Sequence, residues 1–217
     1  MKKIIIFDLD GTLLDTIADL ATATNQALSL FGYPIHETDA YRFFVGNGIN
    51  KLFERALPEG ARSEENIQKI RSEFIPFYNL HNADLSRPYP GIPALLNTLQ
   101  EKGMKIAVAS NKYQEATRKL VHQFFPDINF IEVLGQREGV PSKPHPQVVF
   151  EIMEKAGVNA SETVYVGDSC VDMQTGKNAG VTTIGVSWGF QPRTELESYQ
   201  PDFIADRAAD ILQFLSE

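Results

Sequence analysis

Two aspartates two positions apart follow a short apolar run near the start of the chain. Asp8 and Asp10 come directly after residues 4–7, and Gly11 follows them. Carboxylates this close repel each other, so either one of them holds a proton or a cation lies between them. Oxygen ligands that leave room for a substrate phosphate suit Mg²⁺, whereas an Asp-Gly pair also fits an ordinary turn. An EF-hand calcium loop is excluded, because Leu13 takes the position that requires glycine.

Other polar residues with catalytic potential follow apolar runs later in the chain. Ser110-Asn111 and Asp168 each end such a run, and Lys143 lies in a loop flanked by prolines. Ligands of open α/β sheets bind beyond the carboxyl ends of the strands, so we expect these residues to meet Asp8 there. Taken alone, Ser110 is typical of a turn and Lys143 of a solvated surface. Together, acids, a hydroxyl, a lysine and a metal indicate a phosphoryl-transfer site.

An alternation of strands and helices is needed to place these residues at one edge. Apolar runs predict strands at residues 4–7, 105–110, 130–134, 163–166, 182–186 and 203–204. Helical spacing of apolar residues, with proline near some starts and glycine near most ends, predicts helices at residues 91–102, 114–124, 146–156, 171–179 and 208–215. We therefore expect an α/β fold, a Rossmann-like three-layer core with helices on both faces of a parallel sheet.

A long helical segment interrupts this alternation after the first strand. Residues 16–86 contain no convincing strand and have helical character, with breaks at residues 46–48 and 58–60. Such a length does not fit a simple strand–helix–strand unit. We expect an inserted all-α domain at residues 16–86, called the cap below, and an α/β core domain formed by residues 1–15 and 87–217.

The composition restricts the class of protein and its partners. The 217 residues are 43% hydrophobic and 22% charged, as in ordinary globular proteins, with a formal net charge of −8. This charge argues against nucleic acid or an anionic membrane surface as a partner. The single cysteine, Cys170, excludes a disulfide framework, and the apolar run at the start is too short for a signal peptide or a membrane span. We expect a cytoplasmic protein.

Four sets of residues resemble the motifs of the haloacid dehalogenase-like superfamily, in order and over the whole chain. They are Asp8-Leu9-Asp10-Gly11-Thr12, Ser110-Asn111, Lys143-Pro144 and Gly167-Asp168-Ser169-Cys170-Val171-Asp172. The resemblance implies a Mg²⁺-dependent phosphatase that acts on a small phosphorylated metabolite. We expect it to be a monomer or a weak homodimer.

The resemblance also implies a role for each motif position. Asp8 would attack phosphorus and form an aspartyl-phosphate, and Asp10 would protonate the leaving alcohol and later deprotonate water. The phosphate would be bound by Thr12, Ser110 and the backbone N–H of Asn111, and Lys143 would compensate its negative charge together with Mg²⁺. The metal would be bound by Asp8, the backbone carbonyl of Asp10 and Asp168. Asp172 would either contact the metal through a water or orient Lys143.

The cap position of residues 16–86 also matches the superfamily, and the chain from residue 8 to residue 28 most resembles phosphoglycolate phosphatases. Gly46-Asn47-Gly48 resembles their cap loop, which faces the substrate. A Gly-X-Gly turn offers backbone N–H groups to a carboxylate or phosphate, although it equally fits a turn between helices. Arg42 and Lys51 flank this loop and could pair with a substrate carboxylate.

Several alternatives share some of these features. The dehalogenase branch is excluded, because it lacks the second acid, which is present here as Asp10. A sugar phosphomutase such as β-phosphoglucomutase, a pyrophosphatase or another phosphatase of the superfamily shares the core motifs. A phosphonate hydrolase would use a cap lysine, for which Lys51 and Lys69 are available. A signalling receiver domain lacks a cap and is much shorter. A catalytically dead phosphate-binding module is the non-enzymatic alternative.

Overall fold

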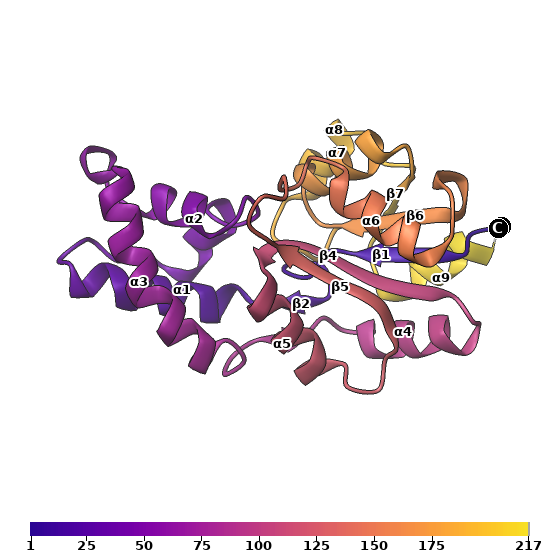
Figure 1. Ribbon diagram of the computed structural model, residues 1–217, viewed down its shortest axis with the longest axis horizontal. Coiled ribbons are helices and arrows are strands. Elements are labelled where there is room, and N and C mark those ends of the chain that lie inside the picture. The colour runs from indigo at the N-terminus through magenta and orange to yellow at the C-terminus, as the bar shows by residue number, and fades with distance from the viewer. Residues whose placement is uncertain (217) are drawn as a thin grey trace.

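A parallel six-stranded sheet forms the centre of the molecule in the computed structural model, which describes residues 1–216 (Figure 1). Its order is β5-β4-β1-β6-β7-β8. The strands are β1 (Ile4–Phe7), β4 (Lys105–Tyr113), β5 (Phe130–Gln136), β6 (Thr163–Gly167), β7 (Thr182–Val186) and β8 (Phe203–Ala205). Ile4 pairs with Lys105 on one side and with Thr163 on the other, so β1 is an inner strand. This explains why residues 4–7 are all apolar and all buried.

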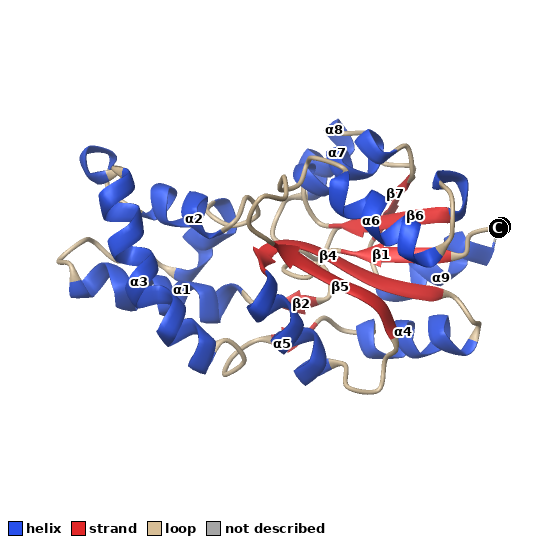
Figure 2. Cartoon of the chain, viewed as in Figure 1, coloured by secondary structure: helices blue, strands red, loops and turns tan. Residues whose placement is uncertain are grey.

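Helices cover both faces of the sheet (Figure 2). Ile5 and Phe7 pack with residues of α4 (Ile92–Glu101), α5 (Gln114–Phe124) and α9 (Ala208–Ser216). Ile4 and Ile6 point to the other face and pack with residues of α6 (Gln147–Ala156) and α7 (Cys170–Ala179). Two shorter helical segments, η3 (Ala160–Glu162) and α8 (Arg193–Ser198), complete this part of the chain. The expected three-layer α/β fold is confirmed.

The helices between β2 and β3 form a second body with its own apolar centre, on the left of Figure 1. They are α1 (Ile17–Leu30), η1 (Thr38–Phe43), α2 (Ile49–Ala56), η2 (Glu59–Ala61) and α3 (Glu64–His81). Helices α1 and α3 pack against each other, and Phe53, Phe74 and Tyr78 form a row of neighbouring rings with centres 5.0 Å apart. The division into residues 16–86 and the remainder stays a proposal, which this arrangement supports.

Two very short strands join the ends of the cap, and the sequence did not predict them. Strand β2 (Leu14–Asp15) pairs antiparallel with β3 (Arg87–Pro88). The buried Asp19 carboxylate also links the two ends of the cap, because it accepts hydrogen bonds from the backbone N–H (2.8 Å) and the hydroxyl (2.6 Å) of Ser86. Two-residue strands have no periodicity to detect, and one of them contains a proline.

The helices of residues 1–216 include none that is long and apolar enough to cross a membrane.

Candidate active site

The carboxyl ends of β1, β4 and β6 open into a small cavity between the sheet and the cap. Its polar lining includes Asp8, Asp10, Ser110, Asn111, Lys112 and Asp168. The cap supplies Leu20, Val45, Gly46, Gly48, Ile49 and Leu52. The cavity encloses about 50 Å³, which is room for about four waters. Residues from three strand ends therefore meet at one edge, as the sequence predicted.

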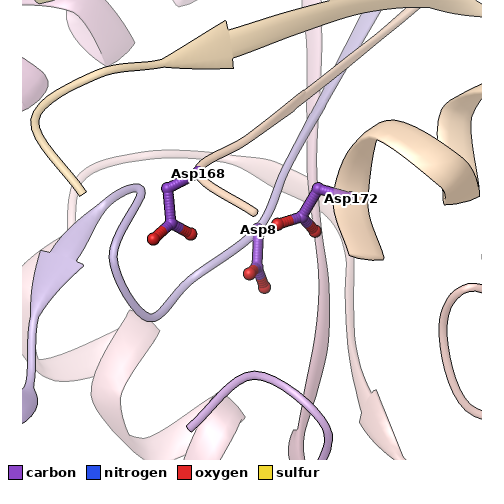
Figure 3. A group of neighbouring side chains, drawn as sticks. All are labelled: Asp8, Asp168 and Asp172. Carbon is purple, nitrogen blue, oxygen red and sulfur yellow. The ribbon is translucent and has the colours of Figure 1, made fainter. Parts of the chain in front are cut away.

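Three buried carboxylates converge at this edge: Asp8 after β1, Asp168 after β6 and Asp172 in α7 (Figure 3). They offer oxygen atoms that all lie within 4.8 Å of one another. Oδ1 of Asp8 is buried and accepts no hydrogen bond from residues 1–216. Close carboxylate oxygens, one of them without a donor, fit a hard divalent cation such as Mg²⁺.

The surroundings of Asp8 and Asp168 favour their protonated forms as long as no cation is bound. Burial first, and then the Asp172 charge, raise the pKa of Asp8 to about 7, although the nearby Lys143 ammonium opposes the shift. Burial likewise raises the pKa of Asp168 well above its usual range, and the charges of Asp172 and Asp8 add to this effect. A cation between the carboxylates would offset these repulsions.

Lys143 is a buried part of this site and does not lie on a solvated surface. Its ammonium donates to Asp172 Oδ1 (2.8 Å), to the Ala109 carbonyl (3.0 Å) and to the Tyr165 hydroxyl (3.0 Å). It also lies 2.9 Å from Asp8 Oδ1, as an ion pair without hydrogen-bond geometry. Burial lowers the pKa of Lys143, but the charges of Asp172 and Asp8 outweigh it and raise that pKa well above the usual range.

The carboxylate of Asp172 is fully occupied by protein donors. Besides Lys143, it accepts hydrogen bonds from the Tyr165 hydroxyl (3.2 Å) and from the Ser169 backbone N–H (3.2 Å) and hydroxyl (2.6 Å). Ser169 and Asp172 together cap the start of α7. This arrangement suits a residue that orients Lys143 better than one that binds a metal directly.

Asp168 lies in a narrow space between two glycines. Its carboxylate accepts from the Thr12 hydroxyl (3.3 Å) and from the Phe190 backbone N–H (2.8 Å). Gly11 has a φ of +82°, and a Cβ there would lie 2.2 Å from Oδ2 of Asp168. A Cβ on Gly189 would lie 2.2 Å from the Asp168 Cβ. Thr12 is buried and contacts this carboxylate, whereas the sequence placed it on the phosphate.

The side chain of Asn111 joins three segments around the cavity. Its Oδ1 accepts from the Lys143 backbone N–H (2.9 Å), and its Nδ2 donates to the carbonyls of Lys143 (3.1 Å) and Gly46 (3.0 Å). The neighbouring Ser110 hydroxyl accepts from the Lys112 backbone N–H (3.2 Å). The sequence-predicted pair Ser110-Asn111 thus lines the cavity, and Asn111 also holds the lysine loop and the cap loop together.

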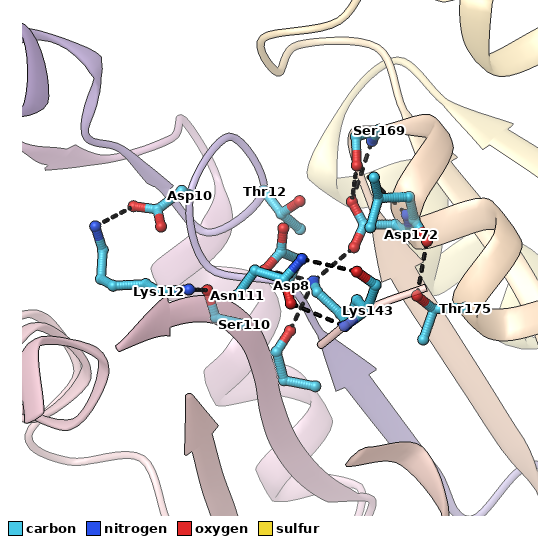
Figure 4. Close-up of polar contacts among 12 residues, drawn as sticks. Asp8, Asp10, Thr12, Ser110, Asn111, Lys112, Lys143, Ser169, Asp172 and Thr175 are labelled. Carbon is cyan, nitrogen blue, oxygen red and sulfur yellow. Dashed lines mark hydrogen bonds and ion pairs between the residues drawn. The ribbon is translucent and has the colours of Figure 1, made fainter. Parts of the chain in front are cut away.

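Asp10 contacts two side chains that no local sequence pattern marks as part of the site. Its Oδ1 accepts from the Thr16 hydroxyl (2.5 Å). The same oxygen lies 3.0 Å from the Lys112 ammonium (Figure 4). Lys112 also donates to the hydroxyl of Tyr78 in the cap helix α3 (2.8 Å). A lysine near a strand end is usually solvated. The only sequence signal for Lys112 as a residue of the site is its position directly after Ser110-Asn111.

The predicted cap residues divide into two groups. Gly46 and Gly48 line the cavity, whereas Arg42 and Asn47 are not part of its lining. Arg42 donates to the Gly189 carbonyl (3.4 Å), and Asn47 accepts from an arginine at the end of α2, Arg55 (2.8 Å). Both therefore hold the cap loop in place in this structure.

Comparisons with known proteins identify relatives of the whole chain. The family model of the haloacid dehalogenase-like hydrolases matches residues 5–186. A phosphoglycolate phosphatase of Vibrio parahaemolyticus is 36% identical, with 99% of this chain and 96% of that protein covered. One of Aquifex aeolicus is 31% identical, with 98% and 96% covered. The crystal structure of a predicted phosphoglycolate phosphatase from Haemophilus somnus superimposes with a TM-score of 0.92 at 30% identity, covering 99% and 98% of the chains.

Proposed function

This chain belongs to the haloacid dehalogenase-like hydrolases and is a phosphoric monoester hydrolase, and we propose that its substrate is 2-phosphoglycolate. The observation that carries the proposal is the pair Asp8 and Asp10 at a cavity that Asp168 also lines, with the Lys143 ammonium 2.9 Å from Asp8. The names of full-length relatives in Vibrio and Aquifex support the choice of substrate.

The acidic cluster is proposed to hold Mg²⁺ through Asp8, Asp168 and the backbone carbonyl of Asp10. When bound, Mg²⁺ would reduce the electrostatic repulsion between the Asp8 carboxylate and a phosphate dianion. Asp172 is assigned to Lys143, because all of its hydrogen-bond contacts are with protein donors. The ammonium of Lys143 then stabilises charge on the transferring phosphoryl group.

The reaction is proposed to proceed in two steps on residues of this chain. In the first step, a carboxylate oxygen of Asp8 attacks phosphorus, the bond to the glycolate oxygen breaks, and Asp10 donates its proton to that oxygen. In the second step, Asp10 takes a proton from a water that attacks the aspartyl-phosphate. Inorganic phosphate leaves, and the Asp8 carboxylate and the Asp10 proton are restored. Ser110 and the backbone N–H of Asn111 would bind the phosphate oxygens in both steps.

The cap is proposed to select for a small substrate. The cavity of about 50 Å³ is far smaller than an ordinary ligand pocket, which favours a small substrate. Gly46, Asn47, Gly48 and Arg42 remain the proposed contacts for the glycolate carboxylate. Since Arg42 binds the Gly189 carbonyl in this structure, it would have to exchange that contact for the substrate. An unchanged KM for 2-phosphoglycolate in Arg42→Ala would remove it from this set.

The proposal is tested by measuring phosphate release from a substrate panel. The panel contains 2-phosphoglycolate, β-glucose 1-phosphate and pyrophosphate, each with Mg²⁺ or with EDTA. We expect the highest kcat/KM for 2-phosphoglycolate, activity only with Mg²⁺, and none in Asp8→Asn. A higher kcat/KM for either other substrate would overturn the choice of substrate, and conversion of β-glucose 1-phosphate to an isomer would indicate a mutase.

A further inference from the structure

Lys112 is a buried cation at the active site to which the proposed reaction gives no role. It follows Ser110-Asn111 in β4, and only 3% of its side chain is exposed. Its ammonium lies 3.0 Å from Asp10 Oδ1 (Figure 4). It also lies 2.8 Å from the Tyr78 hydroxyl and 4.8 Å from the centre of the Tyr78 ring.

Burial of this ammonium points to a function. An ammonium is costly to bury unless a charged partner compensates it, and an apolar residue of similar size would often be equally stable. Among residues 1–216, Asp10 is the only ion-pair partner of Lys112. We therefore expect Lys112 to be important for its effect on Asp10 and not for folding stability.

The contacts of Asp10 separate its two oxygens. Oδ1 is held by the Lys112 ammonium and by the Thr16 hydroxyl (2.5 Å). No side chain or backbone group of residues 1–216 donates to Oδ2. The two donors thus fix Oδ1 on the side of Lys112 and Thr16 and leave Oδ2 as the oxygen without a donor among the described residues. The free oxygen is then the one available to the leaving group.

We propose that Lys112 is a positioning residue that fixes Asp10 for proton transfer and links this geometry to the cap. The inference rests on the proposed role of Asp10 as acid and base. Thr16 stands at the start of α1 and Tyr78 in α3, so both residues that act with Lys112 belong to the cap. A cap displaced from β4 would take the Tyr78 hydroxyl away from the ammonium and leave Asp10 as its remaining polar contact.

The test uses leaving groups that differ in their need for a proton. Lys112→Met keeps the unbranched stem of the side chain and removes the charged ammonium group. The first-turnover release of the leaving group is measured for 2-phosphoglycolate, ethyl phosphate and p-nitrophenyl phosphate. We expect about a 100-fold fall for the two alkyl esters, the loss typical of a misplaced catalytic group. We expect less than about a 3-fold change for the nitrophenyl ester, whose leaving group departs without protonation.

Two further variants serve as control and as support. Lys119→Met removes an exposed lysine of α5 that also reaches the cap, at the Asn79 carbonyl, and has no contact with Asp10. We expect unchanged rates for all three substrates. Tyr78→Phe keeps the ring beside Lys112 and removes only the hydroxyl. We expect the same selective loss as in Lys112→Met, but smaller, and this variant decides the matter if Lys112→Met does not fold.

The outcomes distinguish this inference from the proposed function. An equal fall for all three esters would indicate general damage and overturn the positioning role. A higher KM for 2-phosphoglycolate alone would make Lys112 a contact of the substrate carboxylate and also overturn it, as would unchanged rates. Failure of the wild-type protein to hydrolyse any of the esters with Mg²⁺ would instead refute the proposed function.

Discussion

Replacing Asp168 by asparagine should separate metal binding from folding stability. The substitution removes one of three carboxylates that lie within 4.8 Å of one another. The amide is close in size to the carboxylate, so it fits between Gly11 and Gly189 and can still accept from the Phe190 N–H. Because the pKa of Asp168 is raised well above its usual range, its charge is unfavourable in the metal-free protein. We expect metal-free Asp168→Asn to be at least as stable as the wild type at pH 8.

The size of the metal effect follows from binding linkage. Mg²⁺ at 100 times its Kd adds about 2.7 kcal/mol to the free energy of unfolding. For a chain of this length, 1 kcal/mol corresponds to about 2–4 °C in Tm, so the wild type should gain about 5–11 °C. Asp168→Asn should lose most of this gain at the same Mg²⁺ concentration, because one proposed ligand has lost its charge.

Asp172→Asn, unlike Asp168→Asn, should destabilise the metal-free protein. It removes the charge that pairs with Lys143 at 2.8 Å and places an amide N–H₂ among donors. Breaking a buried ion pair costs about 3–5 kcal/mol, and the low end applies because Lys143 keeps Asp8 at 2.9 Å. The metal-free Tm should therefore fall by about 6–12 °C.

The assay is thermal unfolding of the wild type and both variants with Mg²⁺ or with EDTA. Asp127→Asn serves as the control, because Asp127 is exposed and distant in sequence from the acidic cluster. Its Tm and Mg²⁺ gain should equal those of the wild type. A full Mg²⁺ gain in Asp168→Asn, or a metal-free Tm of Asp172→Asn equal to that of the wild type, would refute this account of the acidic cluster.

Three more predictions concern the same site. Gly11→Ala should abolish the Mg²⁺ gain in Tm and lower kcat at least about 100-fold, because the methyl group overlaps Asp168; kcat near that of the wild type would contradict this. Lys143→Met should lower kcat by about 100- to 1000-fold in steady-state assays, and a change in KM alone would contradict its electrostatic role. The pKa of Asp8 in the folded protein is about 7, above its ordinary value of 3.8, so the folded state binds this proton more tightly than the unfolded state. The resulting gain in the free energy of unfolding is complete below pH 3.8 and is lost as the pH rises to about 7. The metal-free Tm should therefore fall over this range in the wild type and less in Asp8→Asn; equal slopes would contradict the prediction.

The sequence predicted the fold and the meeting of the strand-end residues because both follow from local patterns. Apolar residues 4–7 indicate an inner strand, and the polar residues that end such strands must share an edge of a parallel sheet. Lys143 differs from a surface lysine in the sequence only through the prolines beside it, which are also a local feature. These features depend on residues that are neighbours in sequence.

The parts that were missed depend on contacts between distant segments. Lys112 and Tyr78 are 34 positions apart, and neither shows in its own neighbourhood that it faces the other. The ladder of β2 and β3 depends on the return of the chain from the cap. The charge of Arg42 predicts a carboxylate of the substrate as its partner, but in the structure Arg42 donates to the Gly189 carbonyl, 147 positions away. Such pairings are set by how the cap sits on the core, which no local pattern contains.

The central claim is that the phosphoryl group passes through the carboxylate of Asp8. The direct measurement is mass spectrometry of acid-quenched protein after mixing with 2-phosphoglycolate and Mg²⁺, with Asp8→Asn as the matched control. We predict a phosphorylated peptide that contains residue 8, labile to hydroxylamine, and no phosphorylation or phosphate release in the variant. Phosphate release by Asp8→Asn, or a phosphoryl group on another residue, would contradict the account.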